Sequence, residues 1–428
     1  MHSFDLDLND ISKIEGHTNM SVKVRDDKVT ECHLEISEGK RFFKQAITGM
    51  SYDLVPSTMS RICGTCSAAH ALCSVEAIEN AYDVRVTKQT KILKNLLMNG
   101  GHLRDHAMHL YFFCLPDVFK KESVFDFKGE LHKWVHDGLD VKDAGTFLST
   151  VIGGRAVHPP FLAVGGFTSF PSKTMMKEAI AKLNQVRGKI LDLAEVFYNY
   201  RVDFKRKTNY VALFNKDYNY VDGFIKTADG SVISEDRYAD YLDRVVLPYS
   251  TADAFTWKGE DFVVGAVSRL NLNRDSLHKK TKKDCAKYLA KFPSDSVFDN
   301  NLAQAIECVQ AVDNSVEYLE WLLKNIKKEK LAKVVPRDGI GVGVVEAPRG
   351  TLYYKLEMLK DGTVKKPELC IPTQQNIFHI EKDIAKYVEE LLKKKANKEG
   401  ISLKVEEMIR AYDPCMSCAT HFLKIKWI

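Results

Sequence analysis

Two C-x-x-C motifs near opposite ends of the 428-residue chain constrain its fold more than any other feature. The first motif is Cys63–Cys66 and the second is Cys415–Cys418. A C-x-x-C motif lets two sulfurs face one metal, and four thiolates select soft or borderline metals such as zinc, iron, nickel or copper. A zinc ribbon usually closes a local loop of about 15–20 residues between its two pairs. A site built from these two pairs would instead bring both ends of the chain to the centre of the fold.

Composition limits the class of protein. The 62 Lys and Arg residues against 57 Asp and Glu leave a net charge of +5, which does not argue for a nucleic-acid partner. No apolar run approaches the roughly 18 residues of a membrane helix, and Met1–Asp5 does not begin a signal peptide. We therefore expect a soluble, cytoplasmic protein. Six cysteines outside the two motifs are interpreted as reduced core thiols: Cys32, Cys73, Cys114, Cys285, Cys308 and Cys370.

The spacing of apolar residues predicts a mainly α fold with small β elements, an α+β class. A β-meander is expected over 4–36 and a hairpin over 340–358, whereas 215–300 gives no clear pattern. We find no internal repeat and no linker, so we expect a single domain, residues 1–428, built on a central bundle of long helices. The expected helices span 57–81, which would contain Cys63 and Cys66, 87–115, which Pro116 would end, 172–205, 301–331 and 375–395.

The residues around the cysteine pairs are more specific than the pairs themselves. The first pair lies in R-I-C-G-T-C-S-A-A-H (61–70) and the second in D-P-C-M-S-C-A-T-H (413–421). Three shorter motifs accompany them: I-E-G-H (14–17), E-A-P-R-G (346–350) and I-P-T (371–373). With these motifs the chain resembles, over nearly its whole length, the large catalytic subunit of nickel–iron hydrogenases. Its length, the R-F-F segment (41–43) and the C-S-A-A-H run resemble the cytoplasmic, NAD(P)-linked, sulfhydrogenase-type branch of that family.

The resemblance implies a nickel–iron centre held by the four cysteines. Cys63 and Cys415 would bind nickel alone, and Cys66 and Cys418 would bridge nickel to iron. The other ligands of the iron would be cyanide and carbon monoxide, which maturation proteins must install. On spacing and residue type alone, a structural zinc site is an open alternative.

The resemblance also assigns the groups that would move protons and polarise the substrate. A proton would leave on the bridging thiolate of Cys418 or via Arg349, and Glu15 would then carry it outward, a relay that suits a carboxylate beside a metal-bound sulfur. The permanently charged guanidinium of Arg349 would lie over the metals, on a turn fixed by Pro348. Asp105 and Asp413 would hold that arginine.

Further residues match groups that surround the metals. Thr373 would donate a hydrogen bond to an iron cyanide, and His70 would be a partner of the Cys66 sulfur. His102, His106 and His109 fall on one helical face. We expect packing and hydrogen bonding for His102 and His106, whereas His109 resembles a histidine near the arginine.

One part of the chain departs from the family. His421 and the backbone carbonyl of Leu369 match two ligands of a structural magnesium, but Lys44 stands where the family has a glutamate ligand. An ammonium group cannot coordinate magnesium, so we expect Lys44 to replace the metal. The tail 422–428 matches a segment that the family usually removes after nickel insertion.

The activity implied is reversible heterolytic cleavage of dihydrogen. Because the four cysteines leave no clear cluster motif, electrons would pass through an iron–sulfur small subunit, and then through flavin and ferredoxin-like subunits to or from NAD(P). The alternatives are a coenzyme F420- or ferredoxin-linked hydrogenase, a non-catalytic subunit descended from hydrogenases, and a zinc-stapled structural protein. Bound nickel would separate the hydrogenase from the last two.

Overall fold

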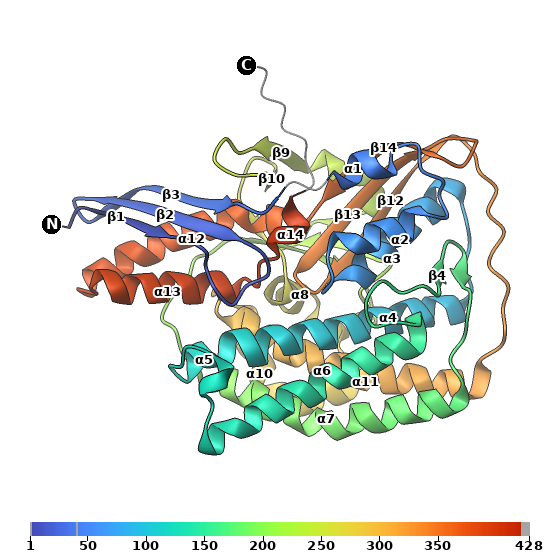
Figure 1. Ribbon diagram of the computed structural model, residues 1–428, viewed down its shortest axis with the longest axis horizontal. Helices are drawn as coiled ribbons and strands as arrows, with labels where there is room; N and C mark the ends of the chain where they lie inside the picture. The colour runs from blue at the N-terminus through green and yellow to red at the C-terminus, as the bar shows by residue number, and fades with distance from the viewer. Residues whose placement is uncertain (1, 40–41, 421–428) are drawn as a thin grey trace.

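The computed structural model describes residues 2–39 and 42–420 and contains a bundle of four long helices (Figure 1). These are α4 (Lys88–Ala107), α6 (Lys133–Gly153), α7 (Lys173–Asn199) and α11 (Asp299–Asn325). Around the bundle α4 packs on α6, α6 on α7, α7 on α11 and α11 back on α4. The predicted central bundle is therefore confirmed, although α6 was not expected from the sequence.

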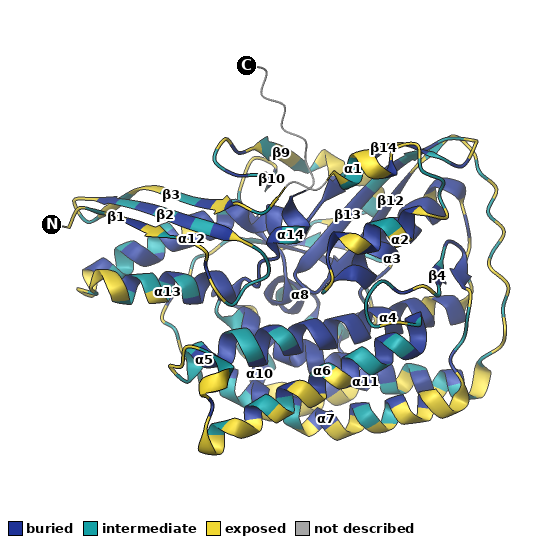
Figure 2. Ribbon diagram, viewed as in Figure 1, coloured by how far each residue is buried: buried dark blue, intermediate teal, exposed yellow. Residues whose placement is uncertain are grey.

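Capping side chains mark where two of these helices begin, and the helices differ in how much of their surface is buried. The side chain of Thr87 accepts a hydrogen bond from the Thr90 amide, and Ser172 caps α7 in the same way through Met175. The outward faces of α6 and α7 are exposed, whereas α4 is buried along most of its length (Figure 2). The helix that carries several predicted site residues thus lies inside the molecule.

Two three-stranded antiparallel sheets lie outside the bundle. The predicted meander is confirmed as β1 (Phe4–Leu8), β2 (Thr18–Arg25) and β3 (Lys28–Ile36), and it packs on α12 (Pro372–Lys393). The predicted hairpin is confirmed as β12 (Gly339–Ala347) and β13 (Gly350–Met358), with β14 (Val364–Cys370) as an unexpected third strand.

Shorter elements complete the described chain. A four-stranded sheet has the order β11-β6-β7-β8, and β9–β10 and β4–β5 form two-stranded pairs. The strands are β4 (Leu162–Ala163), β5 (Gly166–Phe167), β6 (Asn209–Phe214), β7 (Phe224–Thr227), β8 (Val232–Ile233), β9 (Leu242–Val246), β10 (Asp253–Trp257) and β11 (Phe262–Val263). The remaining α-helices are α1 (Phe43–Ile47), α2 (Val55–Met59), α3 (Ser67–Tyr82), α5 (Leu115–Val118), α8 (Ala266–Asn273), α9 (Lys279–Asp284), α10 (Ala286–Leu289), α13 (Lys398–Ala411) and α14 (Met416–Ala419). Short helical segments of other types are η1 (Ser60–Ile62), η2 (Met108–Cys114, a π-helix), η3 (Val124–Asp126), η4 (Gly129–His132), η5 (Glu235–Asp240) and η6 (Arg274–Ser276).

Two glycines let strand β12 lie directly against helix α3. A Cβ atom added to Gly341 would stand 1.9 Å from the Ala77 carbonyl oxygen, and one added to Gly343 would stand 2.2 Å from the Cys73 carbonyl oxygen. No side chain fits at either position, so the backbones of helix and strand touch. This contact fixes α3, which begins directly after Cys66, against the sheet whose β12–β13 turn carries Arg349.

Two expectations about helices were wrong. The region 57–81 is not one helix, because the chain is extended at Cys63 and α3 begins only at Ser67. The helix over 87–115 does not end at Pro116. The chain continues through the π-helix η2 into α5. Pro116 lies in the first turn of α5, where a residue without a backbone N–H is tolerated.

All ten cysteines are free thiols, including the six outside the motifs that we interpreted as reduced core residues. Five of these six are buried and Cys32 is half-buried. Within 2–39 and 42–420, none of the helices has the length and apolar composition needed to cross a bilayer.

Candidate metal centre

The two C-x-x-C motifs meet at one buried cluster of four sulfurs. The Sγ atoms of Cys63, Cys66, Cys415 and Cys418 all lie within 4.8 Å of one another. Cys66 and Cys418 are 3.2 Å apart, Cys63 and Cys415 are 3.5 Å apart, and Cys415 and Cys418 are 2.7 Å apart. A metal–thiolate bond of about 2.3 Å places sulfurs on one metal on the order of 3–4 Å apart. The four side chains therefore fit a metal-binding set.

The first pair lies on a loop that an arginine holds open. Arg104 of α4 donates hydrogen bonds to the carbonyl oxygens of Gly64 and Thr65. Because these carbonyls bind a guanidinium rather than helical amides, the loop between η1 and α3 stays non-helical. Cys63 and Cys66 can then both turn toward the second pair.

The second pair is held by segments from elsewhere in the chain. The Cys415 amide donates to Thr373 Oγ1 at 2.9 Å, and the Met416 amide donates to the Glu15 carbonyl oxygen at 2.9 Å. Glu15 and Cys415 thus form a short parallel bridge. Asp413 adopts a left-handed conformation with φ 51°, which turns the chain out of α13 toward the cluster.

Burial and the hydrogen bonds among the four sulfurs shift the pKa values of the thiols in opposite directions. Burial raises the pKa of Cys415 and of Cys418 well above the usual thiol range. Hydrogen bonds from the other three thiols instead lower the pKa of Cys63. Binding of a soft cation, which requires thiolates, would release the protons that this buried cluster otherwise retains.

Glu15 contacts the cluster, but through a different cysteine from the one expected. Its Oε2 atom accepts hydrogen bonds from Cys415 Sγ at 3.0 Å and from the Ser417 amide at 3.1 Å. The sequence-based expectation paired this carboxylate with Cys418. The backbone bridge between Glu15 and Cys415 explains the difference, because it aligns the two side chains.

Arg349 lies in the turn between β12 and β13 and is held by both expected acids. Its Nη1 atom donates to Asp105 Oδ2 at 2.6 Å, and its Nη2 atom lies 3.0 Å from Asp413 Oδ1. All three side chains are buried. Although burial disfavours the charge, the two acids raise the pKa of Arg349 well above its usual value. Burial raises the pKa of Asp105, and Arg349 partly offsets this effect.

A small cavity lies between three of the sulfurs and Arg349. Its other walls include Thr373, His70 and apolar side chains such as Leu352. The Thr373 oxygen accepts from Cys415, which leaves the hydroxyl proton to donate. His70 Nδ1 pairs with the Tyr354 hydroxyl at 2.5 Å, and both His70 and Cys66 line the cavity.

His102 and His106 make the packing and hydrogen-bonding contacts expected of them, and His109 lies close to an acid that holds Arg349. His102 stacks on Tyr220 with ring centroids 3.7 Å apart, and His106 Nε2 is 3.0 Å from Glu307 Oε2. His109 lies behind the arginine, with Nδ1 3.8 Å from Asp413 Oδ2. Among the side chains that the structure describes, the four cysteines form the one group arranged for a metal.

Lys44 lies on α1, which packs against the strand β14 that carries Leu369. Its charged neighbours are Arg244, Asp253, Glu368 and Lys366, and burial together with Arg244 lowers the pKa of Lys44 to about 8. His421 and the tail 422–428 lie outside the described residues, as does Arg41 of the R-F-F segment. The replacement of magnesium by Lys44 therefore stays a prediction.

Sequence reasoning missed several buried residues behind the centre. Arg104 shapes the first cysteine loop, and Gln304 Nε2 donates to Asp413 Oδ2 at 2.8 Å. Arg269 supports the turn before Arg349 through the carbonyl oxygen of Pro348. No motif surrounds these residues, so their only signal is a polar side chain among apolar helical neighbours.

Comparison with known proteins agrees with this geometry. A family model described as nickel-dependent hydrogenase matches residues 45–126 and 226–421. Sulfhydrogenase 1 subunit alpha of Pyrococcus furiosus is 31% identical over 430 residues, covering 98% of this chain and 98% of the relative. Sulfhydrogenase 2 subunit alpha of the same organism is 30% identical over 425 residues, covering 98% and 100%.

A solved structure shares the fold. The NAD+-reducing [NiFe]-hydrogenase in its H2-reduced state superposes with a TM-score of 0.87 at 24% identity, covering 98% of this chain and 99% of that one. The four intact cysteines and the family match set aside both the zinc-stapled protein and the non-catalytic subunit. The chain belongs to the nickel-dependent hydrogenase family, as a large, catalytic subunit of the sulfhydrogenase type.

Proposed function

We propose that this chain cleaves dihydrogen reversibly and heterolytically at a nickel–iron group held by Cys63, Cys66, Cys415 and Cys418. The observation that carries the proposal is the convergence of a proton acceptor, Glu15, and a buried cation, Arg349, on one four-sulfur cluster. A structural metal site needs neither group. When bound, the nickel–iron group supplies the Lewis-acid and redox chemistry that polarises the H–H bond and takes up electrons.

The walls of the cavity suit small diatomic ligands on the iron. Apolar side chains such as Leu352 can surround carbon monoxide without leaving a polar group unpaired. The Thr373 hydroxyl proton can donate to a cyanide nitrogen, as a buried acceptor requires. Cys66 and Cys418, which line this cavity, are the residues that we assign to the iron side of the centre.

Three residues have proposed roles in moving charge. Arg349 orients and polarises dihydrogen, because Asp105 and Asp413 keep its guanidinium charged and fixed. The proton passes through the thiol of Cys415 to Glu15, whose Oε2 lies 3.0 Å from that sulfur. This route differs from the two that we expected from the sequence, which ran through Cys418 or via Arg349. Glu15 is partly exposed and can pass the proton onward.

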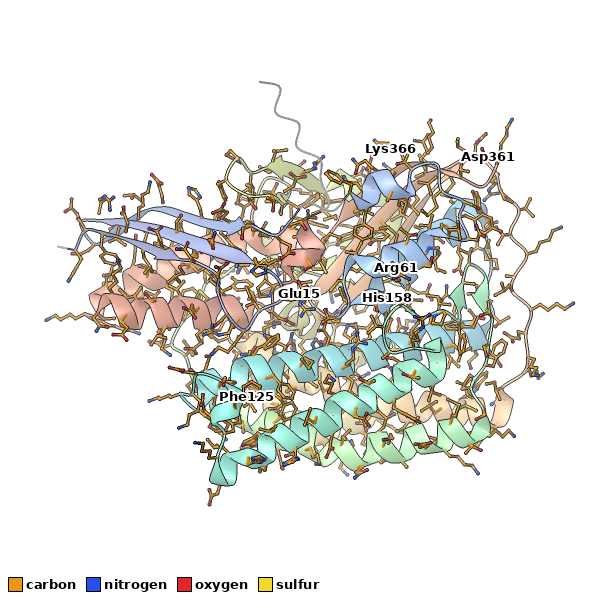
Figure 3. All side chains as sticks on the ribbon, viewed as in Figure 1. Glu15, Arg61, Phe125, His158, Asp361 and Lys366 are labelled. Atoms are coloured by element: carbon orange, nitrogen blue, oxygen red, sulfur yellow. The ribbon has the colours of Figure 1, made fainter. Side chains whose placement is uncertain are left out.

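We propose that electrons leave on the side of Cys63. Gly64 is exposed, and a Cβ atom added to it would meet nothing within 4 Å. The exposed Arg61 and the half-buried His158 lie near one another on this side (Figure 3), with His158 Nδ1 3.1 Å from the Ser60 carbonyl oxygen. An iron–sulfur small subunit docked on this face would sit close to the metals, as electron tunnelling requires.

For the electron acceptor and the cellular location, our proposal is supported by the relatives. The sulfhydrogenase alpha subunits and the shared fold with an NAD+-reducing hydrogenase support a cytoplasmic complex that exchanges electrons with NAD(P) through flavin and ferredoxin-like subunits. Hydrogen-dependent reduction of NAD+, NADP+, coenzyme F420 and ferredoxin by the assembled complex decides among these acceptors. Maturation proteins would install the metals, and residues 1–428 would act as one domain.

Infrared spectroscopy tests the centre directly. Iron-bound carbon monoxide and cyanide absorb where protein bands are nearly absent. We expect such bands in protein purified with its native maturation system, and we expect them to shift under dihydrogen. A Cys63→Ser variant should lose nickel and the shift, whereas Cys73→Ser, a buried cysteine outside the cluster, should keep both. Nickel-loaded protein without these bands would refute the proposal.

A further inference from the structure

A second buried arginine, Arg269 of α8, supports the turn that carries Arg349. Its Nη1 atom donates to the Ala347 carbonyl oxygen at 3.0 Å, and its Nη2 atom donates to the Pro348 carbonyl oxygen at 2.9 Å. These carbonyls belong to the two residues directly before Arg349. The guanidinium of Arg269 therefore fixes the backbone from which the Arg349 side chain projects.

Two glutamates hold Arg269 in this position. Glu307 of α11 binds it with two parallel hydrogen bonds, at 2.6 Å to Nε and 2.7 Å to Nη2. Glu346 of β12 accepts from Nη1 at 2.8 Å. An arginine has five N–H donors, and the two carbonyls and three carboxylate contacts give Arg269 five acceptors. A lysine ammonium, with three donors and no planar fork, cannot reproduce this set.

The two glutamates are themselves anchored to the core. Glu307 also meets the Tyr218 hydroxyl at 2.8 Å and His106 Nε2 at 3.0 Å. Glu346 Oε1 accepts from the Leu213 amide at 2.6 Å and from the Thr351 hydroxyl at 2.7 Å. The contacts link α8, α11, α4 and the β12–β13 turn in one buried network around Arg269.

The turn itself has little room to move. Gly350 has φ 135°, and a Cβ atom added to it would stand 2.5 Å from Val264 Cγ2. Arg349 is thus fixed at both ends, by Asp105 and Asp413 at its guanidinium and by Arg269 at its backbone. A displacement of the turn would carry the guanidinium away from the cavity beside the sulfurs.

We propose that Arg269 is a positioning residue for dihydrogen cleavage, setting where Arg349 sits beside the metal-binding sulfurs without touching the substrate. The inference rests on the role proposed above for Arg349. Misplacing a group that acts on the substrate by about 1 Å can lower the rate by about 100-fold. Loss of Arg269 should therefore reduce turnover much more than substrate affinity.

A double-mutant cycle on the assembled, nickel-loaded complex tests the proposal. We expect Arg269→Lys to lower kcat for hydrogen oxidation by about 10- to 100-fold, with KM for dihydrogen changed less than about 3-fold. Arg349→Lys should lower kcat by about 100-fold or more. If Arg269 acts through Arg349, the double variant should be about as active as Arg349→Lys alone.

A matched control separates positioning from general destabilisation. Arg187 of α7 forms a similar bidentate pair with Asp313 of α11, at 2.7 and 2.8 Å, but it contacts neither Arg349 nor its turn. Arg187→Lys should lower thermal stability and leave kcat within about 2-fold of wild type. Nickel content and the infrared bands should match wild type in all variants compared.

Glu346→Gln provides a second variant if Arg269→Lys does not assemble. It keeps an acceptor for Leu213 and Thr351 but turns an amide toward Arg269, so kcat should fall by about 3- to 10-fold, again with no further loss beside Arg349→Lys. Full activity of both variants, losses that multiply with that of Arg349→Lys, or an equal loss in Arg187→Lys would overturn the proposal. Full activity of Arg349→Lys alone would instead refute the role proposed for Arg349.

Discussion

A single carboxylate oxygen of Glu15 accepts hydrogen bonds from both a thiol and a backbone amide. The Oε2 atom accepts hydrogen bonds from Cys415 Sγ and from the Ser417 amide. The backbone amide does not titrate, so this hydrogen bond keeps the side chain directed at the cluster whatever the pH. A glutamine in its place could still accept from the amide. It could not take up a proton at ordinary pH.

We therefore predict that Glu15→Gln keeps nickel but loses about 100- to 10,000-fold of its hydrogen oxidation rate, the usual contribution of a general base. Hydrogen–deuterium exchange between D2 and water by the loaded complex should fall in parallel, because it needs the same proton route. Glu35→Gln, an exposed glutamate on β3, is the control and should behave as wild type. Normal exchange in Glu15→Gln would exclude this carboxylate as the relay.

The surroundings of Lys44 lead to a prediction about metal content. Two further cations, Arg244 and Lys366, share its environment with Asp253 and Glu368, and a second cation disfavours a divalent ion there. We expect elemental analysis of active protein to find nickel and iron but substoichiometric magnesium, and chelation by EDTA to leave activity unchanged. One magnesium per active chain would show that Lys44 does not replace the metal.

At the scale of elements, the turn η5 carries a carboxyl that should make stability depend on pH. Glu235 accepts from the Gly223 amide at 2.9 Å, and burial, with help from Asp222 and Asp236, raises its pKa from 4.5 to about 8. Between these values the folded chain keeps a proton that the unfolded chain has released. Stability should therefore fall as the pH rises from about 4.5 to about 8.

Glu235→Gln should remove this contribution, since an amide is neutral throughout the range. Melting temperatures measured from pH 5 to pH 8.5 should fall less steeply in the variant than in wild type. Asp240→Asn, an exposed change on the same turn, should retain the wild-type slope. Parallel slopes in Glu235→Gln and wild type would contradict the assignment.

The elements that the sequence predicted well are those with regular spacing, such as the meander and the helices α7, α11 and α12. The prediction of one helix over 57–81 was wrong for a specific reason. Arg104, which is distant in sequence, donates hydrogen bonds to the carbonyl oxygens of Gly64 and Thr65, so these carbonyls do not accept helical hydrogen bonds. The residues of the site also divide into those that local sequence predicts and those that it does not. Residues inside short motifs, such as Glu15 and Arg349, were predictable by resemblance, whereas Arg269 and Gln304 act through tertiary contacts that no local pattern records.

Across the whole molecule, the sulfur cluster joins the loop before α3 to the segment after α13. A metal bound only by the folded chain stabilises that state, and a tighter-binding metal stabilises it more. We predict that protein made without nickel melts at a lower temperature than loaded protein. Amide hydrogen exchange should be faster at 62–67 and 412–420 in the nickel-free form, and unchanged in the bundle helices. Equal exchange in both forms would show that the protein alone orders the centre.

The distance in sequence between the two cysteine pairs also has a consequence for biosynthesis. During translation, the bundle helices and the sheet that carries Arg349 leave the ribosome long before Cys415 and Cys418. A growing chain can therefore build the walls of the centre while it still holds only half of the sulfurs. A polypeptide cut short before residue 415 would present only two of the four thiols of the site. Stable metal retention therefore indicates that synthesis has passed that residue.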